Sequence, residues 1–258
     1  MPVERADFLL IDNSNSFTKF ALASRTRLGA TRKIATRSLD EAALREVLRG
    51  WKFARVVLSS VVPEKGDVIA RYLAPVPVLR VSARVDLGVG IDYPKPKTIG
   101  ADRLANAASA THYFGAPVVV VDFGTAVSFD IISRERKYVG GVIAPGLEAM
   151  TDYLHQRTAL LPKISLLEPP AAIGKSTRQA MLAGAVYGYR GLVRQILIEI
   201  GKQLGIPHNL QVVATGGYAK LIAAKLPEIE AVEPNLTLEG LRLVWEAHCR
   251  SGASGDRR

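Results

Sequence analysis

Residues 8–22, FLLIDNSNSFTKFAL, and residues 118–132, VVVVDFGTAVSFDII, align without a gap, so that Asp12 coincides with Asp122 and Ser14 with Gly124. In each copy an apolar run ends in Asp, small residues turn the chain, and a second apolar run follows. This pattern predicts two β-hairpins. The backbone amides of such a turn can hold phosphate oxygens, while the Asp can hold a metal ion or position a water. The repeat therefore indicates a duplicated nucleotide-binding unit.

The composition is that of an ordinary globular chain of 258 residues, with 48% hydrophobic and 22% charged residues. Cys249 is the one cysteine, the start has no apolar stretch typical of a signal peptide, and no apolar run approaches the roughly 20 residues that span a bilayer. We expect a soluble, cytoplasmic protein without a membrane segment. The net charge of +10 comes from dispersed basic residues. Attraction of an anionic substrate such as ATP explains this excess better than nucleic-acid binding does.

Alternating apolar and amphipathic segments predict α/β layering. In the first half we expect strands at 8–12, 17–23, 28–37, 55–61 and 76–81, helices at 40–50, 64–73 and 102–114, and a loop rich in Gly and Pro at 85–100. In the second half we expect the hairpin at 118–132, a strand at 137–143, helices from 146, at 176–204 and at 238–249, and a frayed tail at 251–258. The halves divide into lobes 1–115 and 116–258, with the site in the cleft between them.

Two familiar phosphate-binding motifs fail here. Gly174-Lys175-Ser176-Thr177 ends like a Walker A loop, but Pro169 stands where the first Gly is required. Gly88-Val89-Gly90 lacks the third Gly and the helix of a dinucleotide fingerprint.

The segment Gly100-Ala101-Asp102-Arg103 lies where a Gly-rich loop enters a helix, so its amides suit an anionic group. Asp and Arg side by side can act as a base and a carboxylate clamp. The alternative is a helix-capping Asp beside a solvated Arg.

A series of motifs occurs in one order along the chain: Asp12-x-x-Asn15-Ser16-x-x-Lys19, Tyr93, Gly100-Ala101-Asp102-Arg103, Asp122-Phe123-Gly124-Thr125-Ala126, Gly140-Gly141-x-Ile143-x-Pro145-Gly146, Ile173 to Thr177, and Thr215-Gly216-Gly217. In order and spacing this series resembles the type III pantothenate kinases of the sugar kinase, actin and Hsp70 superfamily. The resemblance implies an α/β fold with duplicated actin/ribonuclease H-like lobes, in which mixed sheets are flanked by helices. It also implies ATP-dependent phosphorylation of pantothenate to 4'-phosphopantothenate, the first step of coenzyme A biosynthesis.

The resemblance also implies roles for individual residues. The catalytic base is Asp102, and pantothenate is bound by Tyr93, Gly100, Ala101, Asp102, Arg103 and Thr177, the last reaching it from the neighbouring subunit of a homodimer. The ATP-binding residues are Asp12, Asn13, Ser14, Asn15, Ser16, Phe17, Thr18, Lys19 and Thr125, and Thr215 to Gly217 form the adenosine-side loop. Asp12 is placed near Mg²⁺, directly or through water, and Asp122 matches the ligand of a monovalent cation, K⁺ or NH₄⁺. Within the helix expected at 176–204, small residues at Ala180, Gly184 and Gly188 predict a flat stripe for helix packing.

Ser14 departs from the family, which has Gly at this position. A crowded turn, or one with positive φ, would cost Ser about 1 kcal/mol relative to Gly and weaken ATP binding. Alternatively, the Ser hydroxyl donates a hydrogen bond to phosphate. The departure also leaves open a catalytically weak relative that acts as an accessory or regulatory binding protein, whereas retention of Asp102, Arg103 and Asp122 favours the enzyme.

Overall fold

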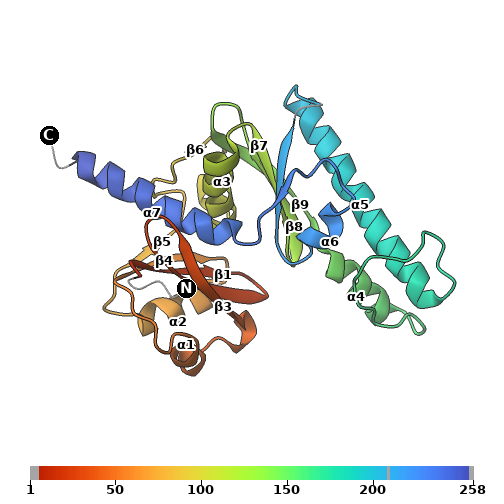
Figure 1. The fold of residues 1–258 in the computed structure, drawn as a ribbon, viewed down its shortest axis with the longest axis horizontal. Coiled ribbons are helices and arrows are strands. Elements are labelled where there is room, and N and C mark those ends of the chain that lie inside the picture. The colour runs from red at the N-terminus through yellow and green to blue at the C-terminus, as the bar shows by residue number, and fades with distance from the viewer. Residues whose placement is uncertain (1–5, 208–209, 256–258) are drawn as a thin grey trace. The chain divides into compact units, whose positions relative to one another are not determined.

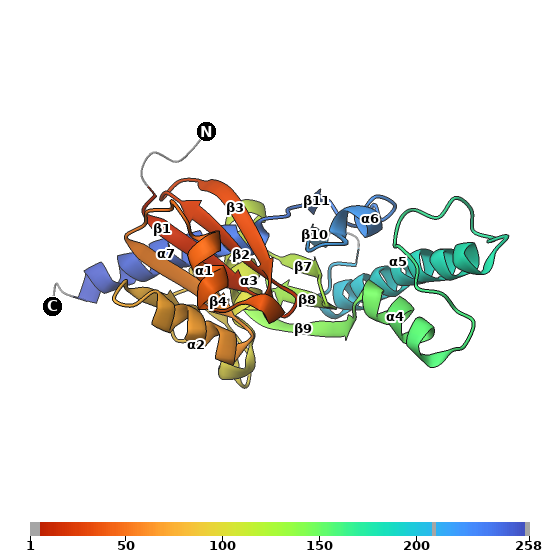
Figure 2. The same ribbon diagram turned by 90° about the horizontal axis from the view of Figure 1, so that it is seen from below.

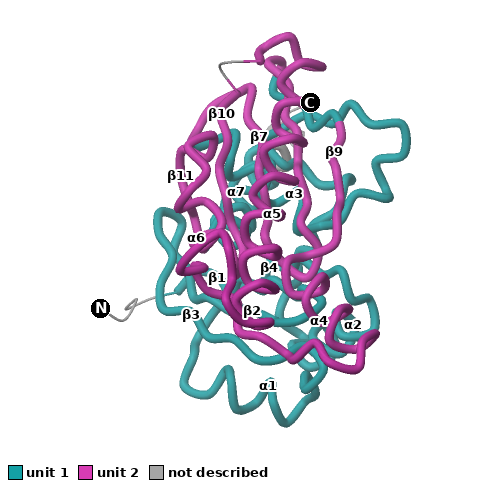
Figure 3. Tube along the Cα trace, turned by 90° about the vertical axis from the view of Figure 1, so that its right-hand side faces the viewer, with its two compact units in different colours: residues 1–113, 136–139, 235–258 teal, residues 114–135, 140–234 magenta. Residues whose placement is uncertain are grey.

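The computed structural model describes residues 6–207 and 210–255, and the chain forms two compact units (Figure 3). Unit 1 comprises residues 1–113, 136–139 and 235–258, and unit 2 comprises residues 114–135 and 140–234. These units differ from the expected lobes because the last helix and residues 136–139 belong to unit 1. The last helix joins unit 1 because its apolar side chains pack there, as the ring of Trp245 does 5.4 Å from that of Phe8.

Unit 1 is built on a five-stranded mixed sheet of order β3-β2-β1-β4-β5 (Figure 1). Its strands are β1 (Phe8–Asn13), β2 (Phe17–Ala23), β3 (Leu28–Ala35), β4 (Arg55–Ser60) and β5 (Val78–Arg80). The first hairpin supplies the antiparallel pairs, and β4 and β5 add parallel to β1. The expected strand at 28–37 stops at Ala35 because residues 36–38 form a 3₁₀ turn.

Strand alternation gives this sheet two apolar faces. Leu9, Ile11 and Phe20 pack against Leu44 of α1 (Glu41–Val47) and Ile69 of α2 (Pro63–Tyr72) in one core. Side chains on the other face of β1 meet α7 (Leu236–Gly255), which also contacts β4 (Figure 2). Both faces of β1 are therefore covered by helices, and its carboxyl end carries Asp12.

Residues 85–100 form a loop, as expected, apart from the two-residue strand β6 (Gly90–Ile91) and the 3₁₀ turn Pro96–Thr98. β6 pairs with the first residues of β9 (Lys137–Pro145). The loop leads into α3 (Ala101–Phe114), whose five alanines favour the helix and let it pack closely. This arrangement places the Gly100-to-Arg103 segment at the start of a rigid helix.

Unit 2 contains β7 (Val118–Phe123), β8 (Ala126–Ile132), most of β9, β10 (Gln211–Thr215) and β11 (Ala231–Val232), in the order β11-β10-β7-β8-β9. β7 is central, and its four valines are fully buried, as expected for a strand covered on both faces. The helices are α4 (Leu147–Arg157), α5 (Thr177–Gln203) and α6 (Ala219–Ala223). α4 packs against α5, and both views show the two helices side by side (Figures 1 and 2).

The two hairpins are present, but the alignment without a gap fails beyond the turn. Asp12 pairs with Lys19 across the first hairpin, whereas Asp122 pairs with Ser128, one position earlier than the alignment requires. The first connection, residues 14–16, is one residue longer than the second, residues 124–125. Phe20 is therefore the structural counterpart of Phe129, and both are buried. A one-residue gap restores the same inward and outward alternation in both copies.

At the carboxyl end of the chain, α7 continues to Gly255, so the expected fraying is wrong for residues 251–255, and residues 256–258 lie outside the described part. Across the described residues, helices fall short of the length and apolarity that a bilayer crossing demands.

Candidate active site

Asp102 lies in the first turn of α3, where Leu104 N–H donates to Gly100 O at 3.1 Å. Gly100 is thus the residue that opens the helix, and Asp102 is not a capping residue. Asp102 Oδ1 accepts a hydrogen bond from Arg103 N at 2.8 Å. Burial raises the pKa of the Asp102 carboxyl above its ordinary value, although the Arg103 amide and charge oppose this shift. A half-buried carboxylate of raised pKa is a plausible proton acceptor.

Gly100 leaves room for this carboxylate. A Cβ at Gly100 would lie 2.5 Å from Asp102 Oδ1, well inside van der Waals contact. The sequence analysis selected Gly100 for its backbone amide, but the structure gives the missing side chain a role of its own. Any larger residue here must displace the Asp102 carboxyl.

Arg103 is the start of a cation–aromatic cluster in unit 1. Its guanidinium lies 5.7 Å from the ring centroid of Tyr138, and the ring of Tyr93 meets that of Tyr138 edge-on at 6.1 Å. Tyr138 is 1% exposed and Tyr93 is 37% exposed, so only the outer ring is available to a ligand. The structure thus brings Tyr93 and Arg103 together as expected. The sequence gives no indication of Tyr138, because a tyrosine in a strand carries no local signal of function.

Asp12 is the residue before the last in β1 and is 3% exposed. Its Oδ1 accepts a hydrogen bond from Ser14 Oγ at 2.8 Å. The turn is closed by Ser14 N–H, which donates to Phe17 O at 3.3 Å. Ser14 is therefore a side-chain partner of Asp12.

The expected strain at Ser14 is absent. Among the described non-glycine residues only Arg136 has a positive φ, of 58°. Gly124, which occupies the same place in the second hairpin, also has no positive φ, and a Cβ there would meet Ala126 O at 3.5 Å, an ordinary contact. Neither turn needs glycine, so the strain explanation for weak ATP binding is wrong.

A buried polar network holds the first turn. Asn13 Nδ2 donates to Thr18 Oγ1 at 2.8 Å, and Ser60 Oγ donates to Asn13 Oδ1 at 2.7 Å. Thr18 Oγ1 and Thr36 Oγ1 are 3.0 Å apart, and Thr36 Oγ1 donates to Ser14 O at 2.6 Å. Asn13 is 1% exposed and Thr18 is fully buried. Their side chains shape the turn from within.

The remaining residues of the first turn face outward. Asn15 and Ser16 are exposed, Phe17 is 47% exposed, and Lys19 is half-buried. These residues and the turn amides form the part of the hairpin that a ligand can reach.

The second turn is held by glycines from distant parts of unit 2. Gly146 precedes α4, and a Cβ there would lie 2.3 Å from Thr125 O. Gly216 has φ 94°, and a Cβ there would lie 2.6 Å from Asp122 Oδ1 and from the Phe123 backbone. The Pro145-Gly146 and Thr215-Gly216-Gly217 motifs thus converge on the turn that carries Asp122 and Thr125.

Thr177 is exposed and is the first residue of α5. Ser176 caps this helix by accepting a hydrogen bond from Gln179 N at 3.3 Å. Thr177 is far from the second turn in sequence. It belongs to the helix that carries the predicted stripe of small residues. Ala180, Gly184 and Gly188 of that stripe are all exposed.

The donors around the two aspartates suit hard cations that complete their shell with other ligands. The described residues contain no cluster of three or more His, Cys, Asp or Glu side chains. Asp12 is a single carboxylate, which fits Mg²⁺ held largely by substrate phosphates and water. The missing side chain of Gly216 leaves room for Asp122 Oδ1, because a Cβ there would lie 2.6 Å from this atom. Asp122 therefore offers a carboxylate oxygen as a ligand for a cation.

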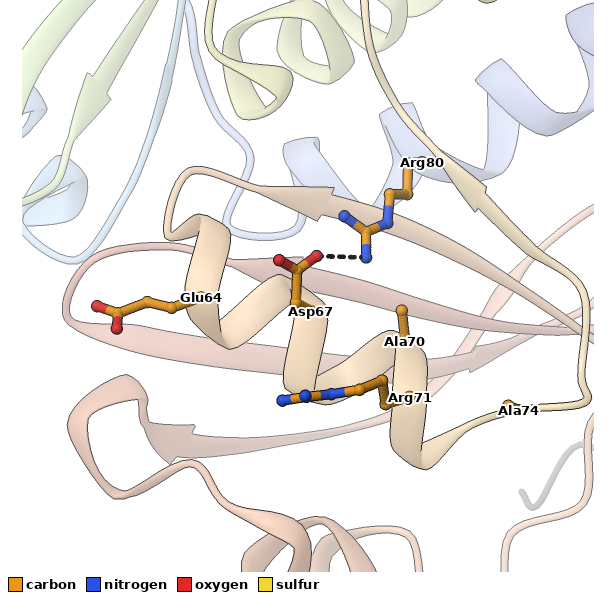
Figure 4. Close-up of a pocket in the computed structure, with 6 residues that line it drawn as sticks. All are labelled: Glu64, Asp67, Ala70, Arg71, Ala74 and Arg80. Atoms are coloured by element: carbon orange, nitrogen blue, oxygen red, sulfur yellow. Dashed lines mark hydrogen bonds and ion pairs between the residues drawn. The ribbon is translucent and has the colours of Figure 1, made fainter.

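A cavity of about 640 Å³ lies apart from these residues, on α2 and β5 (Figure 4). It is lined by Glu64, Asp67, Ala70, Arg71, Ala74 and Arg80. Arg80 Nη2 pairs with Asp67 Oδ1 at 2.8 Å, so charges of both signs meet at its wall. None of the candidate residues contributes to it.

The charge of the chain is unevenly distributed. Unit 1 carries 24 Lys and Arg residues against 14 Asp and Glu residues, whereas unit 2 carries ten of each kind. The whole excess of +10 thus belongs to the unit with the first hairpin and Arg103.

A family model described as type III pantothenate kinase matches residues 8–199. A type III pantothenate kinase of Akkermansia muciniphila is 51% identical over 237 residues, covering 92% of this chain and 97% of the relative. One of Methylacidiphilum infernorum is 40% identical, covering 92% of this chain and 88% of the relative.

Solved structures at low identity show the fold alone. MreB 5 of Spiroplasma citri bound to AMPPNP has a TM-score of 0.57 at 11% identity and covers 98% of this chain and 100% of its own. Component A of the Acidaminococcus fermentans (R)-2-hydroxyglutaryl-CoA dehydratase has a TM-score of 0.53 at 13% identity, covering 95% and 98%. The expected actin-like fold with mixed sheets flanked by helices is confirmed.

Proposed function

This chain belongs to the type III pantothenate kinase family, and we propose that it phosphorylates pantothenate at the expense of ATP to give 4'-phosphopantothenate, the first step of coenzyme A biosynthesis. The observation that carries the proposal within the site is Asp102, a half-buried carboxylate of raised pKa beside Arg103 and two tyrosines. Phosphoryl transfer needs a positioned hydroxyl, neutralised phosphate charge and a proton acceptor, and these residues supply the acceptor side.

Asp102 receives the proton of the pantothenate hydroxyl as that oxygen attacks the γ-phosphorus of ATP; the bond from this phosphorus to the β,γ-bridging oxygen breaks, and ADP leaves. The Arg103 amide holds one carboxylate oxygen at 2.8 Å, which leaves the other oxygen for the substrate. Gly100 keeps this orientation available because a larger residue would displace Oδ1. Ala101 adds a backbone amide at the start of α3, where the helix dipole favours a nearby anion.

Arg103 binds the carboxylate of pantothenate, and the Tyr93 ring covers the apolar part of the substrate. A guanidinium can pair with a carboxylate through two parallel hydrogen bonds, which fixes direction as well as distance. Tyr138 stands beneath both residues and acts as a positioning residue, because its buried ring supports the Arg103 side chain.

The first hairpin binds the ATP phosphates through its turn amides and through Asn15, Ser16 and Lys19. Asn13 and Thr18 contribute by shaping the turn, since their side chains are committed to the buried network. Phe17 lies at the exposed edge of the same hairpin. In the second hairpin, Thr125 contacts ATP from a turn that Gly146 and Gly216 hold in place.

Two cations complete this proposal. Asp12 would hold Mg²⁺, directly or through water, and Asp122 would hold K⁺ or NH₄⁺; together these ions neutralise the phosphate charge of bound ATP. An oxygen-lined site discriminates by size, so activity should be high in K⁺ or NH₄⁺ and low in Na⁺. Equal turnover in potassium and sodium buffers would remove Asp122 from this role.

The active form is a homodimer in which Thr177 reaches pantothenate bound to the other subunit. Support comes from large apolar side chains exposed on the surface of unit 2: Leu160 is 88% exposed, Ile173 83% and Tyr153 61%. Exposed apolar groups of this extent mark an interface. A monomer by light scattering at micromolar concentration that retains full activity would refute the shared site.

The accessory-protein alternative now has less support. It was motivated by a strained turn at Ser14, and the positive φ that would produce such strain is absent. The enzyme is therefore the function that this site favours.

The decisive experiment is Asp102→Asn in an assay that couples ADP release to pantothenate. The amide oxygen still accepts the Arg103 N–H, but it cannot take a proton, so turnover should fall by about 10² to 10⁴. Glu64→Gln, an exposed carboxylate on α2, is the control and should retain wild-type turnover. Wild-type turnover in Asp102→Asn would leave the residue a purely structural role.

The raised pKa gives this variant a second readout. The acidic limb of kcat/KM for pantothenate should lie above the ordinary Asp pKa of 3.8, because the base acts only when ionised. For an acid whose folded pKa is raised, ionisation costs stability above the unfolded pKa, and this cost is absent below it. Asp102→Asn should therefore melt at or above the wild-type temperature at pH 7.5, with the difference shrinking toward pH 4.

A further inference from the structure

Three side chains stand in one row across the first sheet. Asp12 of β1 lies opposite Lys19 of β2, and Lys19 lies opposite Lys33 of β3. Residues directly opposite each other in neighbouring strands project from the same face. The other face carries Ile11 and Phe20, which belong to the core with α1 and α2. Lys33 therefore shares its face with the two first-hairpin residues proposed to serve ATP.

The Lys33 ammonium makes a cation–π contact on that face. Its Nζ lies 5.0 Å from the ring centroid of Phe17, which is two residues before Lys19 and so projects to the same side. Phe17 is 47% exposed and Lys33 is exposed, so the ammonium remains close to water. A contact of this kind at an exposed site is weak and readily exchanged for a stronger partner.

The two lysines of this row repel each other. Like charges directly opposite each other on an antiparallel pair destabilise it, and Lys19 and Lys33 are such a pair. Within the described part of the chain, no salt bridge is formed by Lys33. A polyphosphate near both ammonium groups would turn this repulsion into attraction.

We propose that Lys33 is a second phosphate-binding cation of the first hairpin, which leaves the Phe17 ring to bind the polyphosphate of the nucleotide together with Lys19. This inference rests on the proposed function only in taking ATP as the ligand of the hairpin. The competing explanation is that Lys33 is an edge-strand charge that prevents pairing with another chain, since β3 is the sheet edge. That role would not depend on nucleotide.

The test is calorimetric titration of the full chain with ATP, ADP and AMP, with magnesium present and pantothenate absent. Lys33→Gln should weaken ATP binding about threefold to fivefold, the upper part of the range for one partly solvated charge contact. ADP binding should weaken less and AMP binding should stay within a factor of two of wild type, because the effect follows the phosphate chain. Lys33→Arg should restore most of the affinity.

Lys52→Gln is the matched control, because it removes one exposed positive charge from the same unit in the turn before β4. It should leave ATP affinity near wild type at 0.15 M salt, where distant charges are screened. The unliganded Lys33→Gln variant should melt at or slightly above the wild-type temperature, since a like-charge pair is removed.

Equal weakening by Lys33→Gln and Lys52→Gln would reduce the effect to net charge and overturn the inference. Wild-type ATP affinity in Lys33→Gln, or equal weakening for AMP and ATP, would also overturn it. If wild-type protein binds ATP but fails to phosphorylate pantothenate, the proposed function fails while the Lys33 comparison still decides this inference.

Discussion

The turn of the first hairpin is fixed by side-chain hydrogen bonds, whereas the turn of the second is fixed by close backbone packing. Asn13, Thr18 and Thr36 join the first turn to β2 and to the residues after β3. In the second turn, apolar Phe123 and Val127 are buried at the places that Asn13 and Thr18 occupy in the first. Gly146 and Gly216 pack so closely against the second turn that a Cβ at either position would collide with its backbone.

This difference shows how one ancestral pattern can be stabilised in two ways. A polar network tolerates neighbours of many shapes but requires every donor and acceptor to be matched. Glycine packing requires no hydrogen bonds but excludes every side chain at two positions. Substitutions should therefore be costly at different kinds of residue in the two copies.

The largest effect is expected for Gly216→Ala. The new Cβ would lie 2.6 Å from the Phe123 backbone, and the φ of 94° is itself unfavourable for Ala. Overpacking and backbone strain together should lower the free energy of unfolding by about 2 to 4 kcal/mol. Urea unfolding measures this.

Gly217→Ala is the control for that variant, since a Cβ there has nothing within 4 Å. If both substitutions were equally tolerated, packing of Gly216 would not hold the second turn.

A smaller loss is expected for Thr18→Val in the first turn. The shape is kept, but the hydroxyl that accepts from Asn13 is lost, and a buried unsatisfied group costs about 1 to 3 kcal/mol. Thr18→Ser, which keeps the hydroxyl, should recover most of the unfolding free energy. Thr31→Val, at an exposed position of β3, should change little. Equal stability of Thr18→Val and wild type would show that the network is dispensable.

The sequence predicted the strands, the main helices and the start of α3 well, because these depend on local periodicity. It could not show the extra residue in the first turn, because the apolar residues after the turn match whether the two hairpins are aligned without a gap or with a gap of one residue. Only burial distinguishes them: Phe20 and Phe129 both face inward once one residue is skipped.

Features of the site that arise from distant contacts were equally invisible. Tyr138 meets Tyr93 and Arg103, which lie far away in sequence, and Gly146 and Gly216 both lie against the second turn. Their motifs were noticed as family signatures, but their mutual packing follows only from topology. The comparison of Ser14 with Gly124 and with the Gly of the family predicts backbone strain at Ser14, but Ser14 has no positive φ.

Ser14→Gly should weaken ATP binding about twofold to fivefold, because Asp12 loses the hydrogen bond that orients its carboxylate. Ser14→Ala separates two explanations, since it removes the hydroxyl and keeps the Cβ. Both variants should weaken ATP binding equally in calorimetric titration. Tighter binding in Ser14→Gly alone would restore the strain explanation and contradict the backbone geometry.

The reciprocal change, Gly124→Ser, should have the smallest effect on stability. Its Cβ would meet Ala126 O at 3.5 Å and Asp122 Oδ1 at 3.7 Å, both ordinary contacts, and the backbone has no positive φ. We expect the free energy of unfolding to change by less than about 0.5 kcal/mol. Gly146→Ser makes the contrast, because its Cβ would lie 2.3 Å from Thr125 O and the variant should be strongly destabilised. If Gly124→Ser lowered the free energy of unfolding by more than about 2 kcal/mol, the second turn would require glycine at Gly124 as well as at Gly146 and Gly216, which pack against it. The two turns would then differ in backbone conformation as well as in the residues that hold them.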